Sequence, residues 1–370
     1  MGAGAADAAT DYVPGRESPP SGSVHHGKLR GVMAPERTLI GIDIGGTKVA
    51  GAVLRGKLPA AGVRTHAEVE PPAIRERLTV ATDTTSADGC VDGIDECARQ
   101  LAATAGHVDA VGVGVASMID YATGRVVASV NLPLNDVPLR DMLARRLGVP
   151  VAIDNDATAA TIGEHVFGVG VGAHEMLMLT LGTGVGGGII CGGRPYRGAS
   201  GAAAELGHLL IDVKGPECPA ACPGRGCLEA YVSGTAMGAA ALTEARAKPA
   251  SALGRALAAG EAVDSRLLTR LALAGDADAV AVLGRVGEYL GAGLVTLTNV
   301  FNPELIVIGG GAAAAGELLL GPARRVLAAR GLRPAREQVR VVPAAFGADA
   351  GLVGAAALAL SELFAEDGSA

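Results

Sequence analysis

The stretch that decides the fold is Gly41-Ile42-Asp43-Ile44-Gly45-Gly46-Thr47-Lys48, and Leu181-Gly182-Thr183-Gly184-Val185-Gly186-Gly187-Gly188 repeats its pattern. Each stretch follows one apolar run and leads into another, so the order strand, glycine turn, strand occurs twice. Glycine lets backbone N–H groups close on an anion, and threonine adds a hydroxyl. Two such turns predict a site that grips one polyphosphate from two sides.

Other structures use similar turns. Gly182, Gly184 and Gly187 satisfy the G-x-G-x-x-G pattern of dinucleotide-binding folds, but that turn opens a helix, whereas the residues at 189–191 predict a strand. The first turn ends in Thr47-Lys48, which reverses the order of a Walker loop. An ordinary hairpin fits either turn alone. The occurrence of two favours phosphate binding.

Composition bounds the class of protein. The 370 residues suffice for two domains, and a net charge of −7 with 2% aromatic residues disfavours nucleic acid as a partner. We expect no membrane span and no secretion signal, and therefore a cytoplasmic protein. Residues 1–37, rich in Gly, Ala, Ser and Pro, predict a disordered N-terminal extension.

From residue 38 the signals of strands and helices alternate, which predicts an α/β fold whose sheets are covered by helices. Because the strand–turn–strand unit recurs, we expect two domains with a cleft between them, at 38–150 and 151–348, with a helix at 349–364 packing back on the first. Strands are expected at 38–44, 49–54, 78–83, 109–115, 151–154, 175–181, 186–191, 305–308 and 339–342. Helices are expected at 90–105, 138–147, 156–166, 230–247, 277–299, 316–330 and 349–364.

Asp154-Asn155-Asp156 ends an apolar run just before a predicted helix. Asp154 or Asn155 fits the role of helix N-cap, which these residue types commonly take. The alternative is chemistry, with Asp156 as a general base and Asn155 holding the substrate. Phosphoryl transfer needs a positioned hydroxyl and a nearby carboxylate to take its proton.

Glu205-Leu206-Gly207-His208 is followed by three cysteines within ten positions, Cys218, Cys222 and Cys227, and then by Glu229. One histidine and three cysteines complete a tetrahedral zinc set without an open position, so the loop 208–227 predicts a structural zinc. Three free thiols are the alternative, which their ready oxidation disfavours. Further on, a buried strand runs into Gly309-Gly310-Gly311, where a nucleotide could approach the backbone closely.

These motifs together resemble the ROK family of sugar kinases and sugar-responsive repressors, over residues 38–360. The motifs are DIGGTK at 43–48, NDA at 155–157, LGTGVGGG at 181–188, ExGH at 205–208 and GCLE at 226–229. The resemblance implies a duplicated actin-like (ribonuclease H-like) ATPase fold with an interdomain cleft. It also implies transfer of phosphate from ATP, with magnesium, to a hexose, commonly at the 6-hydroxyl. We expect a homodimer or homotetramer.

The resemblance also implies roles for single residues. Asp156 is the catalytic base, and Asp43 lies by the magnesium. His208 has two roles, ligating zinc through one ring nitrogen and sugar through the other. Sugar hydroxyls are bound by Asn131, Asn155, Glu205, His208 and Glu229. The phosphates lie at Gly45, Gly46, Thr47 and Lys48, the γ-phosphate at Thr183 and Gly184, and the nucleotide along Gly309, Gly310 and Gly311.

The chain departs from the family pattern mostly on the sugar side. The cysteine loop carries two extra residues, Ala220 and Ala221. Glycines of the pattern are missing at Ala204, at Ala116-Ser117 and at Leu134-Asn135, and Thr158 stands where asparagine is usual. The phosphate turns are intact, so phosphoryl transfer is expected with an open choice of acceptor.

We therefore favour an ATP-dependent hexose kinase, with glucokinase first. A kinase for a modified sugar, such as an amino sugar or a cyclitol, is the alternative. A sugar-sensing regulator and a non-catalytic sugar-binding protein are less favoured, because no DNA-binding helices are expected in residues 1–37 and Asp156 and both turns are present. The sequence leaves the donor open between ATP and polyphosphate.

Overall fold

The computed structural model describes residues 36–57, 70–219 and 222–366. Most of the predicted N-terminal extension and both inserted alanines, Ala220 and Ala221, lie outside these residues. Glu36 and Arg37 belong to the first strand, which corrects the predicted end of the extension at residue 37.

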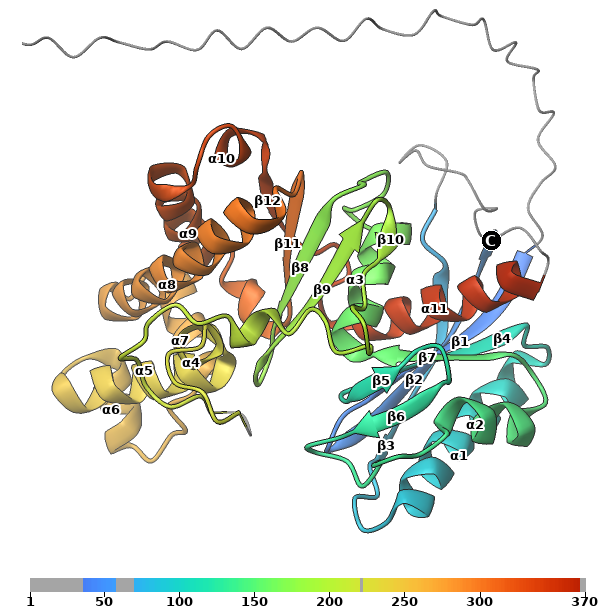
Figure 1. The fold of residues 1–370 in the computed structure, drawn as a ribbon. Coiled ribbons are helices and arrows are strands. Elements are labelled where there is room, and N and C mark those ends of the chain that lie inside the picture. Colours follow the sequence, from blue (N-terminus) through green and yellow to red (C-terminus); the bar gives the residue numbers. More distant parts are fainter. Residues whose placement is uncertain (1–35, 58–69, 220–221, 367–370) are drawn as a thin grey trace, which may run out of the picture. The chain divides into compact units, whose positions relative to one another are not determined.

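Two five-stranded sheets form the framework (Figure 1). The first has the order β3-β2-β1-β4-β7 and the second the order β10-β9-β8-β11-β12. In each, a central strand pairs antiparallel with the strand after its glycine turn and parallel with a later strand. The duplication predicted from the two turns is therefore present in the strand pairing. The first sheet comprises β1 (Glu36–Ile44), β2 (Lys48–Lys57), β3 (Ala73–Ala81), β4 (Ala110–Val115) and β7 (Val151–Asn155). The second comprises β8 (Met176–Leu181), β9 (Val185–Cys191), β10 (Arg194–Pro195), β11 (Leu305–Gly309) and β12 (Arg340–Pro343).

Helices cover both faces of the first sheet. On one face lie α1 (Ala87–Ala105) and α2 (Leu139–Leu147), and on the other α11 (Ala350–Glu366) contacts β1, β4 and β7 (Figure 1). A small hairpin of β5 (Met118–Asp120) and β6 (Arg125–Ala128) follows β4. Apolar side chains fill both interfaces, so the sheet is the middle of three layers.

The helix α3 (Asp156–Phe167) packs against both α11 and β9. At its crossing with α11, a Cβ on Gly163 would lie 2.8 Å from Gly354 Cα, and one on Gly354 would overlap the carbonyl of Ala159. The two backbones therefore touch with no side chain between them. This contact requires glycine on both helices.

The second sheet carries a larger helical layer. The helices α8 (Ala277–Phe301) and α9 (Glu317–Arg330) pack on each other and enclose the main core with α4 (Glu229–Val232), α5 (Gly234–Ala247), α6 (Ala252–Ala258), α7 (Ser265–Leu273) and α10 (Ala335–Gln338). By length and composition alone α8 could cross a membrane, which corrects the expectation that no run qualifies, and half of its apolar window is buried inside the protein.

The structure shifts several predicted boundaries. The strand β7 pairs with β4 and therefore belongs to the first sheet, which corrects the start of a second domain at residue 151. The predicted helix 230–247 is broken at Ser233, whose extended backbone caps α5. The division into two domains itself stays a prediction, because residues 34–370 group into one compact unit.

Candidate active site

The first glycine turn, between β1 and β2, has carbonyl groups that accept hydrogen bonds from a residue outside the turn. The N–H of Gly45 donates to the carbonyl of Lys48 at 3.1 Å, which closes the turn. The hydroxyl of Thr82 donates to the carbonyl of Gly45 at 2.8 Å, and its N–H to that of Thr47 at 3.3 Å. Within the described residues the N–H groups of Gly46 and Thr47 make no hydrogen bond, so they are available to an anion.

The second turn, between β8 and β9, is built in the same way. The N–H of Gly182 donates to the carbonyl of Gly184 at 2.9 Å. The start of α5 holds the carbonyls of the turn, through the N–H of Gly234 on Gly182 at 2.7 Å and the hydroxyl of Thr235 on Thr183 at 2.8 Å. Across the described part of the chain, no partner faces the N–H of Thr183 or Gly184. Both turns thus offer backbone donors.

Two carboxylates lie beside the first turn. Asp43 is half-buried near the end of β1, and its pKa is raised to about 6, first by burial and then by the negative charge of Asp156, against the opposing charge of Lys48. Asp156 is the first residue of α3, and burial raises its pKa too, while the N–H of Ala157, at 2.9 Å from Oδ1, opposes the rise. Two neighbouring carboxylates repel each other, which favours a cation at this place.

Asn155 takes the capping role that the sequence left open. Its Oδ1 accepts from the N–H groups of Ala157 and Thr158 at 3.0 and 3.1 Å, so Asn155 is the N-cap of α3. Its Nδ2 donates to the carbonyl of Ser117 at 3.3 Å. One N–H of this amide is left for a substrate, so the predicted sugar contact can only be a donated hydrogen bond.

Asp154 forms a buried ion pair that the sequence analysis missed. Its Oδ2 accepts from Nε and Nη2 of Arg197 at 2.8 and 2.7 Å, and that guanidinium stacks on the ring of Tyr121 at 3.7 Å. Burial raises the pKa of Asp154, and Arg197 opposes the rise. The pair joins β7 to the segment leading to Glu205. No local signal marks it, since its members are far apart in sequence.

Glu205 and His208 form a further polar pair of the site. Oε2 of Glu205 is 3.9 Å from Nε2 of His208. The pKa of Glu205 is raised mainly by burial, lowered by His208, and raised again by Asp156 and Glu229. These side chains are therefore close enough to act on one bound molecule. Ala204, just before them, has a φ of 68°, in the region where glycine is the usual residue.

The cysteine set faces the other nitrogen of His208. Nδ1 lies 3.6 Å from Cys218 Sγ, the sulfurs of Cys222 and Cys227 are 3.9 Å apart, and all four ligand atoms lie within 4.8 Å of one another. Zn–S and Zn–N bonds of about 2.3 and 2.0 Å in a tetrahedron place ligand atoms roughly 3.5–3.8 Å apart. The donor set and its spacing therefore fit zinc.

Glu229 is more deeply buried than a simple sugar ligand requires, with 4% of its surface exposed. Its Oε2 accepts from the N–H of Val185 at 2.7 Å, at the end of the second turn, and its Oε1 lies 3.6 Å from Cys218 Sγ. Its carboxylate thus links the phosphate turn to the cysteine set. No pattern in the sequence predicts this link.

The remaining predicted residues fall into two groups. Asn131 is exposed and lies against the first turn, since a Cβ on Gly46 would be 3.2 Å from its Cβ. Gly310 has a φ of 81° and packs on the backbone of Leu181. The backbone alone therefore requires glycine at this position, whether or not a nucleotide binds there. Gly309 likewise packs on Met178, whereas Gly311 has open space beside it.

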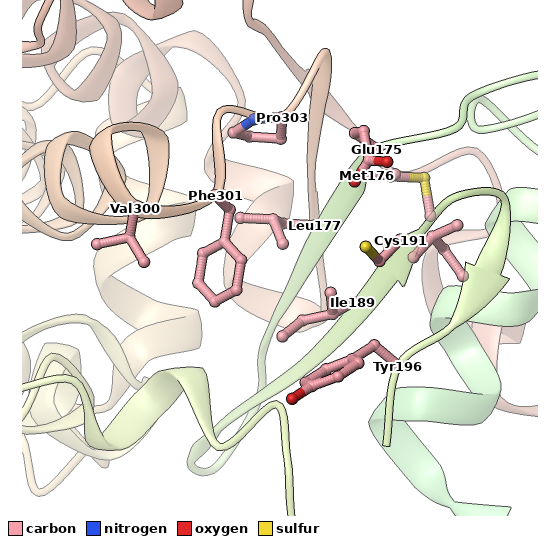
Figure 2. A pocket seen from close by; sticks show the side chains of 10 residues that line it. Glu175, Met176, Leu177, Ile189, Cys191, Tyr196, Val300, Phe301 and Pro303 are labelled. Carbon is pink, nitrogen blue, oxygen red and sulfur yellow. The ribbon is translucent and has the colours of Figure 1, made fainter. Parts of the chain in front are cut away.

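A separate apolar pocket lies on β8 and β9 near the end of α8 (Figure 2). Tyr196 and Phe301 point into it, with Cys191 and Glu175 at its border. None of the predicted site residues lines it. It is therefore not the place where the turns and carboxylates converge.

Comparisons with known proteins identify the family of the chain. The family model described as "ROK family" matches residues 39–362. A glucokinase from Thermotoga maritima is 36% identical over 328 residues, which is 88% of this chain and 98% of the relative. A putative xylose repressor from Caldicellulosiruptor is 32% identical over 74% of this chain and 67% of its own length. A ROK glucokinase from Streptomyces griseus, solved with glucose and AMPPNP, has a TM-score of 0.73 and 36% identity, covering 88% of this chain and 99% of that one.

The chain therefore belongs to the ROK family, as the motifs predicted. Its fold is the duplicated actin-like ATPase fold of that family.

Proposed function

We propose that this protein is an ATP-dependent hexose kinase that transfers the γ-phosphoryl group to a sugar 6-hydroxyl, with glucose as the first acceptor to test. The observation that carries the proposal is the place of Asp156. Its negative charge raises the pKa of Asp43, beside the first glycine turn, and that of Glu205, three residues before His208. A base between a phosphate site and a polyol site is what phosphoryl transfer to an alcohol requires.

In this proposal the chain's own groups do the following. Asp156 accepts the proton of the attacking hydroxyl, and its raised pKa makes it a stronger base than an exposed aspartate. The free N–H groups of the two turns hold the phosphates and stabilise the charge that develops on them. Glu205, His208 and Asn131 orient the sugar through its other hydroxyls, with the one free N–H of Asn155.

Two metals fit this site in different roles. Asp43 would hold Mg²⁺ together with the phosphates of ATP, since magnesium sites at nucleotides commonly use one or two carboxylates. A bound Mg²⁺ would neutralise charge on the phosphates. His208, Cys218, Cys222 and Cys227 would hold a structural Zn²⁺ and fix the ring of His208, so that Nε2 faces the sugar.

A coupled assay of ADP release tests the proposal. Purified protein is given ATP, Mg²⁺ and one acceptor at a time: glucose, mannose, N-acetylglucosamine, N-acetylmannosamine, an inositol, or none. We expect turnover with glucose to exceed that with every other acceptor and to vanish without sugar, and ³¹P NMR to place the phosphate on the 6-hydroxyl. Higher kcat/KM with an amino sugar or inositol would favour the modified-sugar kinase. A parallel reaction with polyphosphate identifies the donor.

A sugar-sensing regulator is the second candidate, because a xylose repressor is among the relatives at 32% identity. Asp156 and both turns favour the kinase, since a sensor needs neither a base nor phosphate donors. Absence of ADP release with every acceptor, together with a sugar-dependent shift of promoter DNA in a gel at low salt, would favour the regulator.

A further inference from the structure

The segment 129–135, which joins the β5–β6 hairpin to α2, carries Asn131 and is held by a small polar network. The hydroxyl of Ser117 donates to Ser129 Oγ at 2.7 Å, and the N–H of Leu132 donates to the same oxygen at 3.2 Å. The N–H of Ser129 donates to Asn135 Oδ1 at 3.0 Å. Ser129 thus ties the segment to itself and to Ser117.

The network reaches the predicted base through one further bond. The carbonyl of Ser117 accepts from Asn155 Nδ2 at 3.3 Å, and Asn155 caps the helix that begins with Asp156. Ser117 therefore contacts Asn155 through its backbone and Ser129 through its side chain. The path from Asn155 to the Asn131 segment is continuous in hydrogen bonds.

Apolar contacts already anchor the segment to the fold. Leu132 and Leu134 are buried in the core of the first sheet. Between them and the hairpin, Val130 is 72% exposed and Asn131 is exposed as well. The leucines hold the segment in place, so what the polar network adds is the orientation of the residues at 129–131. Ser117 and Asn135 also stand at two positions where the chain departs from the family pattern.

We infer that Ser117, Ser129 and Asn135 are positioning residues of the acceptor site, which fix Asn131 for a neutral polyol and so set sugar affinity. This inference rests on the proposed function and deepens its acceptor side. The hydrogen bonds of the network include no described residue of the two phosphate turns. Asn131 itself lies against Gly46 of the first turn, and the test therefore follows KM for ATP beside KM for glucose.

The test is the variant Ser129→Ala, which removes the oxygen that accepts from Ser117 and Leu132. We expect KM for glucose to rise about 5- to 10-fold, the usual effect of one or two lost hydrogen bonds, with kcat and KM for ATP unchanged and a modest fall in the melting temperature. Thr123→Ala is the matched control, since its hydroxyl bonds Asp120 at 2.7 Å at the far end of the same hairpin. Asn135→Asp keeps an oxygen for the N–H of Ser129 and should restore the affinity that Asn135→Leu loses.

A double-mutant cycle separates positioning from a merely structural role. If Ser129 acts through Asn131, adding Ser129→Ala to Asn131→Ala changes KM for glucose no further. Additive effects of the two substitutions on KM for glucose, or an unchanged KM in Ser129→Ala, would overturn the inference. The proposed function would still hold in that case if the wild type phosphorylates glucose. If the wild type does not phosphorylate any sugar, the same cycle is measured on glucose binding by calorimetry. If Ser129→Ala then weakens glucose binding and Asn131→Ala abolishes that effect, the inference holds although the protein is not a kinase. If the wild type does not bind glucose, both the inference and the proposed function are refuted.

Discussion

Glu229 gives the sharpest test of the site, because two of its substitutions should separate two functions. The carboxylate lies behind the second phosphate turn, where Oε2 accepts from the N–H of Val185 at 2.7 Å. A Cβ on Gly184 would lie 2.6 Å from the same oxygen, so the turn and the carboxylate are in direct contact. The sequence predicted that Glu229 binds sugar. The structure adds a second role, because the carboxylate also holds the N–H of Val185 at the end of the turn.

Glu229→Gln keeps an oxygen for the N–H of Val185 and removes the charge. If the carboxylate also accepts hydrogen bonds from the sugar, the loss of about 1.5–3 kcal/mol should raise KM for glucose about 10- to 100-fold. KM for ATP and the melting temperature should stay as in the wild type. Glu229→Ala leaves the N–H of Val185 buried without a partner, at a cost of about 1–3 kcal/mol, so it should lower the melting temperature and raise KM for ATP too.

Steady-state kinetics in both substrates and thermal melts of the two variants decide the matter. Glu217→Gln is the control, since Glu217 is an exposed acid of the same loop that pairs only with Arg225 at 3.2 Å among the described residues. The reasoning fails if Glu229→Gln keeps the wild-type KM for glucose, because Glu229 then only supports the turn and does not bind sugar. It also fails if Glu229→Ala leaves KM for ATP unchanged, since the turn then does not depend on the carboxylate.

Three further predictions follow from the same site. Asp156→Asn should lower kcat by about 10² to 10⁴ with sugar binding kept, and more than a tenth of wild-type kcat would refute the base. Elemental analysis should find one zinc per chain in the wild type and none in Cys222→Ser. Zinc at full occupancy in that variant would show that Cys222 is not a ligand. Asp43→Asn should raise the free energy of unfolding in metal-free buffer at pH 7 by at most about 3 kcal/mol, because the wild-type pKa rises from 3.8 to about 6. That gain should shrink as the pH falls from 6 toward 3.8, where the wild-type carboxylate is protonated in the fold, and a gain independent of pH in urea titrations would contradict it.

The parts of the fold that could be predicted are those with a local signal. The glycine turns after apolar runs predicted the duplicated sheets. The short spacing between His208 and the three cysteines predicted that they form one group, as they do. The strand β3 begins at Ala73, before the expected residue 78, because its charged residues mask the alternation of an exposed edge strand. The break in the helix at Ser233 had a signal, since serine is a common N-cap.

The site was less predictable where function depends on contacts distant in sequence. The pairing of Asp154 with Arg197, and the contact of Glu229 with Val185, join residues 43 and 44 positions apart. Asn155 shows the other limit, because the same residue type serves as cap and as ligand, and only the atoms it contacts decide between them. Pattern identifies which residues carry chemistry, whereas packing determines which of their atoms remain free.

The backbone contact between α3 and α11 has a consequence for how the chain tolerates mutation. Asp156 lies about two helical turns before Gly163 on α3, and Gly351, about one turn before Gly354 on α11, abuts the carboxylate of Asp43. The crossing therefore sets the separation of the two acids, although it lies away from both. A saturation library should find Gly163 and Gly354 as intolerant as the acids themselves, and efforts to stabilise the protein by filling its core should leave these two positions alone.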